Sequence, residues 1–98
     1  MPQPIRPRGP IHLDTAQAIA LEGIAFLAAD PARLRRFLDL TGLGPRELRN
    51  QIATPALQCA ALEHIAADES MLLTFAANCA IAPETVVPAL SALQAASR

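Results

Sequence analysis

The sequence contains no tryptophan, no tyrosine and only three phenylalanines, although 52% of its 98 residues are hydrophobic. Its core must therefore be built from leucine, isoleucine, alanine and a few phenylalanines, which pack well in helices and suit strands poorly. Lysine is also absent, so all eight basic residues are arginine, and the formal net charge is −1. A charge so near zero gives no global attraction to nucleic acid or to an anionic membrane.

Residues that carry chemistry are scarce. The side chains that could ligate a metal are Cys59, Glu63, His64 and Cys79. His64 is five residues from Cys59, a spacing that does not place both on one helical face. No serine has a base and an orienting acid near it in the sequence, and the pair Asp68–Glu69 is explained as a helix cap and a first-turn acid. The sequence therefore predicts no enzyme activity, no cofactor and no metal site.

Long hydrophobic runs are missing too. The longest uncharged run, residues 70–83, is too short to span a bilayer and contains Asn78. The first thirteen residues lack the apolar run of a secretory signal. We therefore expect a cytoplasmic protein without a membrane partner, in which Cys59 and Cys79 are free, largely buried thiols.

Proline divides the chain into two parts. Residues 1–13 hold four spaced prolines, which block helix and ladder formation, so they are predicted to be a disordered tail. Residues 14–98 carry repeated helix-start signals and are predicted to be a single helical domain. Such a signal is a capping side chain followed by a proline or an acid. The expected starts are Asp14 or Thr15, Asp30–Pro31, Pro45, Thr54–Pro55, Asp68 and Pro83.

These signals predict an all-α fold, a compact bundle of five or six short helices. Residues 54–67 are apolar nearly all round, so that helix is expected at the centre of the bundle. Pro88 lies too deep for a comfortable first turn, so the last segment should kink or restart there.

The sequence also repeats itself. Residues 27–48 align with residues 65–86 at an offset of 38 residues. The positions of the first copy that are identical in the second are Ala28, Ala29, Asp30, Leu34, Phe37 and Pro45. Caps and apolar spacing converge in any helical chain, and a duplication would produce the same pattern. If the repeat is a duplication, the bundle consists of two pseudo-repeated helical units.

The stretch "LTGLGPRELR", residues 40–49, allows two interpretations. Residues 40–52 resemble a helix-hairpin-helix motif, in which Gly42 and Gly44 would let a DNA phosphate approach the start of a helix, while Arg46 and Arg49 add charge. Leu48 departs from that motif, which usually keeps a small residue there. This non-sequence-specific DNA binding is the alternative function.

The same stretch is explained as a corner between two helices. Gly42 would take the left-handed position of a Schellman ending, with Leu43 packing back on Leu38, and Pro45 would open the next helix. The second copy keeps the apolar residue and the proline but has no glycine and no nearby arginine. The corner interpretation is therefore favoured, and nucleic acid is the disfavoured partner.

What remains is an interaction module that binds another protein or itself. Residues 33–49 carry five arginines against two acids, whereas residues 50–98 carry one arginine against four acids. The last helix offers more apolar residues than one narrow face needs. The candidate interaction surface consists of Arg33, Arg36, Val87, Leu90 and Leu93.

The segment "LAADPARLRRFLDLTGLGPRELR", with the later "DES" and "LLTFA", resembles a small, mainly alphaproteobacterial family known as domain of unknown function 3572. The resemblance covers roughly residues 15–95. It implies a cytosolic, all-helical bacterial protein without an assigned activity, and it supplies no catalytic residues.

Overall fold

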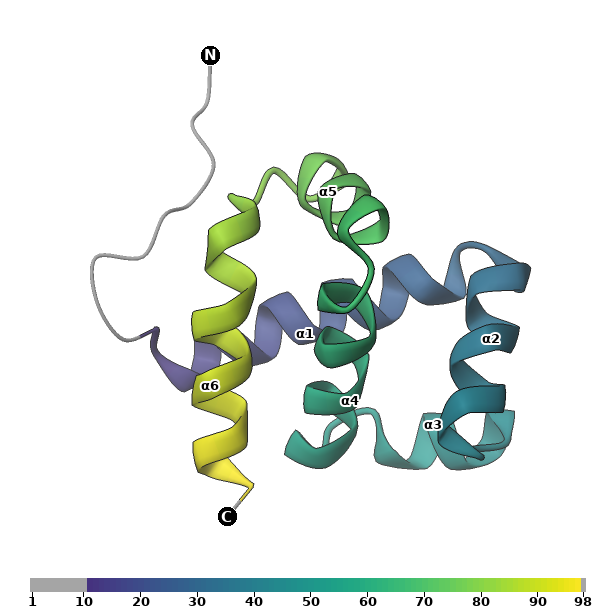
Figure 1. Ribbon diagram of the computed structural model, residues 1–98. Coiled ribbons are helices and arrows are strands. Elements are labelled where there is room, and N and C mark those ends of the chain that lie inside the picture. The colour runs from purple at the N-terminus through teal and green to yellow at the C-terminus, as the bar shows by residue number, and fades with distance from the viewer. Residues whose placement is uncertain (1–10, 98) are drawn as a thin grey trace.

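The computed structural model describes residues 11–97, and this part of the chain consists of helices joined by short loops (Figure 1). The helices are α1 (Leu13–Ala28), α2 (Pro31–Thr41), α3 (Pro45–Gln51), α4 (Pro55–Ala66), α5 (Glu69–Asn78) and α6 (Val86–Ala96), with a short 3₁₀ turn, η1 (Pro83–Thr85), before α6. No strand lies among residues 11–97, so the predicted all-α bundle of five or six helices is confirmed. No helix in this range has both the length and the apolar character needed to cross a membrane.

Side-chain caps begin three of the helices as the sequence predicts. Asp30 accepts a hydrogen bond from the Ala32 N–H at 3.0 Å, and Thr54 accepts one from the Leu57 N–H at 3.3 Å. Asp68 caps α5 by accepting from the Met71 N–H at 3.0 Å. Each cap satisfies a backbone donor that has no partner within the helix.

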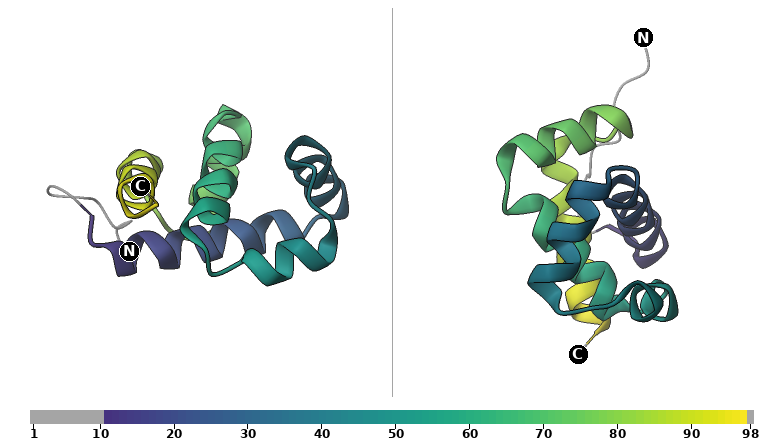
Figure 2. Two further views of the ribbon diagram at one scale, coloured as in Figure 1. Left: turned by 90° about the horizontal axis from the view of Figure 1, so that it is seen from below. Right: turned by 90° about the vertical axis from the view of Figure 1, so that its right-hand side faces the viewer.

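The helices form two layers. Helix α1 lies along one side of the molecule, and α6, α4 and α2 stand beside one another on its other side (Figure 2). Helix α5 follows α4 at the upper ends of these standing helices, and α3 joins α2 to α4 at their lower ends (Figure 1). Packing follows the same plan, because α1 contacts α2, α4 and α6, and α4 also contacts α5 and α6.

Helix α4 lies at the centre, as its all-round apolar sequence predicts. The helix buries Leu57, Gln58, Cys59, Ala61, Leu62 and Ile65. Helix α4 packs against Gly23 of α1, where an added Cβ would lie 3.1 Å from the Ile65 Cδ1 and 3.3 Å from the Leu62 Cδ2. The absence of a side chain at Gly23 therefore lets the two helices pack closely.

The first and last helices correct three predictions. Helix α1 begins at Leu13 with His12 as N-cap, so Asp14 lies in the first turn and not at the cap. Ile11 packs against the core, which removes residues 11–13 from the predicted disordered tail; the rest of that tail, residues 1–10, lies outside the described residues. Pro88 causes no break of its own, because the helix restarts at Val86 and places this proline in the first turn of α6.

The two copies of the repeat have matching backbone geometry at the junctions between helices, α1 with α2 in the first copy and α4 with α5 in the second. The N-cap residues Asp30 and Asp68 have φ, ψ angles of −123°, 114° and −119°, 106°. Ring contacts between the copies are reciprocal. The Phe26 ring lies 5.5 Å from the Phe75 ring, and the His64 ring lies 5.3 Å from the Phe37 ring.

At the offset of 38, Phe26 corresponds to His64 and Phe37 corresponds to Phe75. The ring before each junction therefore packs on the phenylalanine of the other copy, as it would across an approximate two-fold axis. We call α1–α3 the first unit and α4–α6 the second unit.

Candidate functional site

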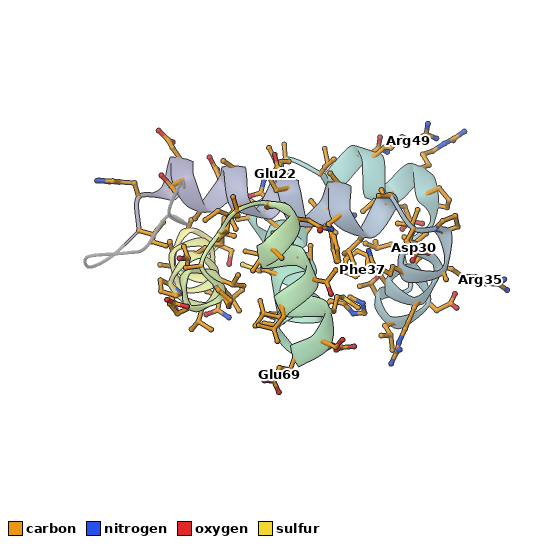
Figure 3. The ribbon with its side chains drawn as sticks, turned by 90° about the horizontal axis from the view of Figure 1, so that it is seen from above. Glu22, Asp30, Arg35, Phe37, Arg49 and Glu69 are labelled. Atoms are coloured by element: carbon orange, nitrogen blue, oxygen red, sulfur yellow. The ribbon has the colours of Figure 1, made fainter. Side chains whose placement is uncertain are left out.

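A cleft of about 420 Å³ lies between α2 and the junction of α4 with α5. We call it the α2–α5 cleft, and its lining residues are Arg36, Leu40, His64, Ala67, Asp68, Glu69 and Met71. Phe37, on the inner side of α2, packs beside it on the His64 ring, whereas Arg35 and Glu69 extend away from the body of the molecule (Figure 3).

His64, which lines this cleft, has an unpartnered ring nitrogen. Its Nε2 is buried and has no hydrogen-bond partner. Burial lowers the pKa of His64 below its usual 6.5, the positive charge of Arg36 lowers it further, and Asp68 opposes both effects. The imidazole is therefore mostly neutral at pH 7, and it keeps an unused hydrogen-bonding nitrogen next to the cleft.

The walls of the cleft differ in charge and polarity. Leu40, 68% exposed, forms an apolar rim on α2, and Arg36 lies on the same wall. Asp68 and Glu69 at the start of α5 line the opposite wall. An apolar rim between charges of opposite sign is suited to hold a polypeptide segment, because such a segment can present an apolar and a polar side chain together.

The glycine corner has the predicted left-handed residue but a different ending. Gly42 has φ of 75°, which confirms its assigned conformation. Its N–H donates to the Leu38 carbonyl at 2.8 Å, and the Leu43 N–H donates to the Thr41 hydroxyl at 3.4 Å. This is the simpler αL ending and not the Schellman motif that the sequence predicts, because the Leu43 N–H is directed to a side chain.

The same corner offers little to a phosphate. The Gly44 N–H donates to the Glu47 carboxylate at 3.2 Å, so an anion of the protein itself occupies the start of α3. Helix α3 has seven residues, and Arg46 and Arg49 are exposed on it. A DNA phosphate at this point would have to displace a carboxylate that the helix start already favours.

The predicted interaction surface is only partly accessible. Val87 is 58% exposed and Leu90 is half-buried. Leu93 is fully buried, so its assignment to the surface was wrong: α6 packs against both α1 and α4 and buries a wider face than one neighbour would. Arg36 lines the cleft, whereas Arg33 contacts Asp30 and the Phe26 ring of its own chain.

The two thiols are free but differ in burial. Cys59 is buried as predicted, whereas Cys79 is only half-buried, and its thiol donates to the Glu22 carboxylate at 3.7 Å. Burial raises the pKa of both thiols, with Glu63 adding to the effect at Cys59 and Glu22 adding to it at Cys79. Neither is an activated nucleophile. Within residues 11–97, no three His, Cys, Asp or Glu side chains are placed to hold a metal ion.

The α2–α5 cleft could not be found from the sequence, because its residues come from three helices and are far apart in the chain. One feature of the sequence could nevertheless have indicated this cleft. Extending the repeat by one residue towards the N-terminus pairs Phe26 with His64, so a polar ring replaces an apolar one at equivalent buried positions.

Comparison with known proteins identifies a family but assigns no chemistry to the cleft. No curated protein and no solved structure matches the chain. A family model matches residues 13–96, nearly the whole of the part that the structure describes. The chain thus belongs to the family described as protein of unknown function DUF3572.

Proposed function

We propose that this protein is a non-catalytic module that binds another polypeptide in the α2–α5 cleft. The observation that carries the proposal is that an exposed leucine, Leu40, and a histidine with a buried and unpartnered ring nitrogen, His64, line the same cleft. Buried polar atoms are normally hydrogen-bonded, and binding clefts typically combine apolar side chains with a few polar groups. A bound polypeptide would cover the leucine and supply a partner to the nitrogen.

The absence of an activated group supports a binding role over catalysis. The thiols of Cys59 and Cys79 have raised pKa values. Among the described residues, no carboxylate is hydrogen-bonded to His64 to orient its imidazole as a base. Free cysteines are typical of reducing compartments, so we place the protein in the cytoplasm.

Partner capture in cells tests the proposal. The protein is expressed in its source organism, cross-linked and isolated, and the bound polypeptides of four versions are compared: wild type, Leu40→Glu, Met71→Arg and Val87→Glu. Leu40→Glu and Met71→Arg change the cleft, whereas Val87→Glu changes an exposed residue of α6 outside it. We expect both cleft variants to lose a polypeptide that Val87→Glu retains.

The opposite pattern would contradict the cleft. A polypeptide that survives Leu40→Glu and Met71→Arg but is lost with Val87→Glu would place the binding surface on α6. Circular dichroism of each variant confirms that helicity is unchanged before the comparison is made.

DNA binding through residues 40–52 is the disfavoured alternative, and a direct titration can test it. Labelled duplex at low salt would show binding that weakens steeply with salt if several phosphates are neutralised. Loss of that binding in the Arg46→Ala, Arg49→Ala double variant would favour the glycine corner as a DNA site. The Glu47 carboxylate on the Gly44 N–H is the reason why we expect no binding.

A further inference from the structure

The two units differ at the aromatic ring that precedes each junction, Phe26 in the first unit and His64 in the second. In the first unit, Arg33 lies over the Phe26 ring, with its guanidinium carbon 4.2 Å from the ring centre. The same side chain approaches Asp30, with 3.7 Å between the arginine Nε and the carboxylate Oδ2. One arginine thus joins the capping acid to the ring and fills the space between them.

The second unit has the same acid and a ring but lacks the arginine. At the offset of 38, Asp30 corresponds to Asp68, Phe26 to His64 and Arg33 to Met71. Among the described residues, no guanidinium lies within ion-pair distance of Asp68. The α2–α5 cleft is lined by these three residues, so it lies where the first unit holds its arginine.

The charges of the cleft leave room for one more cation. Arg36 contributes one positive charge, and Asp68 and Glu69 contribute two negative charges, which gives a local sum of −1. Asp68 uses Oδ1 to cap α5, as Asp30 uses Oδ1 to cap α2, and Asp30 offers its other oxygen to arginine. A planar guanidinium can also stack on an aromatic ring, which an ammonium group does less well.

We propose that the α2–α5 cleft binds an arginine side chain of a partner polypeptide. The guanidinium lies on Asp68 against the His64 ring, as Arg33 lies on Asp30 against the Phe26 ring. An apolar side chain next to that arginine covers Leu40. This proposal rests on the protein-binding function proposed above and names the residue that the partner must present.

The ligand is tested with arginine amide as the probe and lysine amide as its control. The imidazole and backbone signals of isotope-labelled protein are followed by nuclear magnetic resonance during each titration. We expect saturable shifts at His64, Asp68 and Glu69 with arginine amide and clearly weaker shifts with lysine amide, because only the guanidinium is planar and bidentate. Equal responses to both probes, or none at His64, would overturn the proposal.

Two variants show whether the probe occupies the cleft. Met71→Arg places an arginine at the third position of α5, where Arg33 stands in α2, and should fill the cleft from within and abolish the shifts. Asp68→Asn keeps a side chain that can cap the helix but removes the charge, and should weaken the response. An undiminished titration of Met71→Arg would mean that arginine amide binds elsewhere and would overturn the proposal.

Sedimentation of the purified protein distinguishes a second copy from another partner. We expect a wild-type monomer. A wild-type dimer that Met71→Arg converts to a monomer would assign the cleft to a second copy of the chain and overturn the partner named here. If arginine amide fails to bind while the cleft variants still lose their cellular partner, the arginine is wrong and the binding function stands.

Discussion

The first unit turns its corner with a glycine, Gly42, and the second unit turns the equivalent corner with an alanine, Ala80. Both residues are left-handed, with φ of 75° and 52°. The second corner therefore keeps the left-handed conformation although its sequence has no glycine. Both corners thus turn the chain in the same direction after the helix. This structural requirement explains the glycine at position 42, and no bound ligand is needed to account for it.

The two corners reach the same direction by different hydrogen bonds. In the second, the Ile81 N–H donates to the Ala76 carbonyl at 2.9 Å, and the Ala80 N–H donates to the Ala77 carbonyl at 3.5 Å. These are the two bonds of a Schellman ending, which the sequence predicts for the wrong corner. Ile81 is buried, and its burial offsets the strain at Ala80.

The largest effect should come from the phenylalanine that each unit places at the same position. Phe37 and Phe75 are 1% and 0% exposed, so Phe37→Ala and Phe75→Ala should each lower the free energy of unfolding by about 3–5 kcal/mol. Urea unfolding measures both, with the exposed Leu73→Ala as a control of small effect. A near-neutral result for either variant would break the equivalence of the units.

Gly42→Ala should destabilise the protein by about 1 kcal/mol. No atom lies within 4 Å of the added Cβ, so the loss comes from the backbone conformation alone. Asparagine tolerates left-handed angles, and Gly42→Asn should therefore lose less. Thermal unfolding that ranks asparagine below alanine would refute this explanation.

Ala80→Gly should have the opposite sign and stabilise the protein by about 0.5–1 kcal/mol, because it relieves a left-handed alanine. Ala77→Gly is the matched control, since it makes the same change inside α5, where glycine destabilises a helix. Urea titrations in which both variants lose stability would show that Ala80 is not strained.

A smaller effect is expected where the first unit holds its arginine. Arg33→Met copies the second unit and should lower the free energy of unfolding by about 0.5 kcal/mol, since the pair with Asp30 is partly exposed. The exposed Arg35→Met serves as control. If the two variants unfold at the same urea concentration, the contact of Arg33 with Phe26 contributes nothing measurable.

The smallest effect should be the pH dependence caused by His64. Its pKa is lowered in the folded protein, so the unfolded chain takes up this proton at higher pH. The free energy of unfolding should therefore fall as the pH drops through 6.5, with no further loss below the lowered folded pKa. Urea midpoints at several pH values should show this step in wild type and His12→Gln but not in His64→Gln.

Sequence patterns within single helices predicted most of the fold. Features that depend on packing between distant helices could not be predicted from such patterns. The caps at Asp30, Thr54 and Asp68 depend on neighbours two or three residues away, so the sequence alone located them. The burial of Leu93 depends on two other helices at once, which no pattern within α6 records. The same holds for the cleft, since Arg36 and His64 meet only after α2 and α4 have packed.

The contact between α1 and α6 sets the order in which the chain can complete its core during synthesis. These are the first and the last described helices, and both pack against α4 (Figure 1). A ribosome that has released α1 to α5 has therefore exposed apolar faces of α1 and α4 that nothing yet covers. The nascent chain must wait for α6, so stalling within its codons would leave a product that chaperones and proteases recognise.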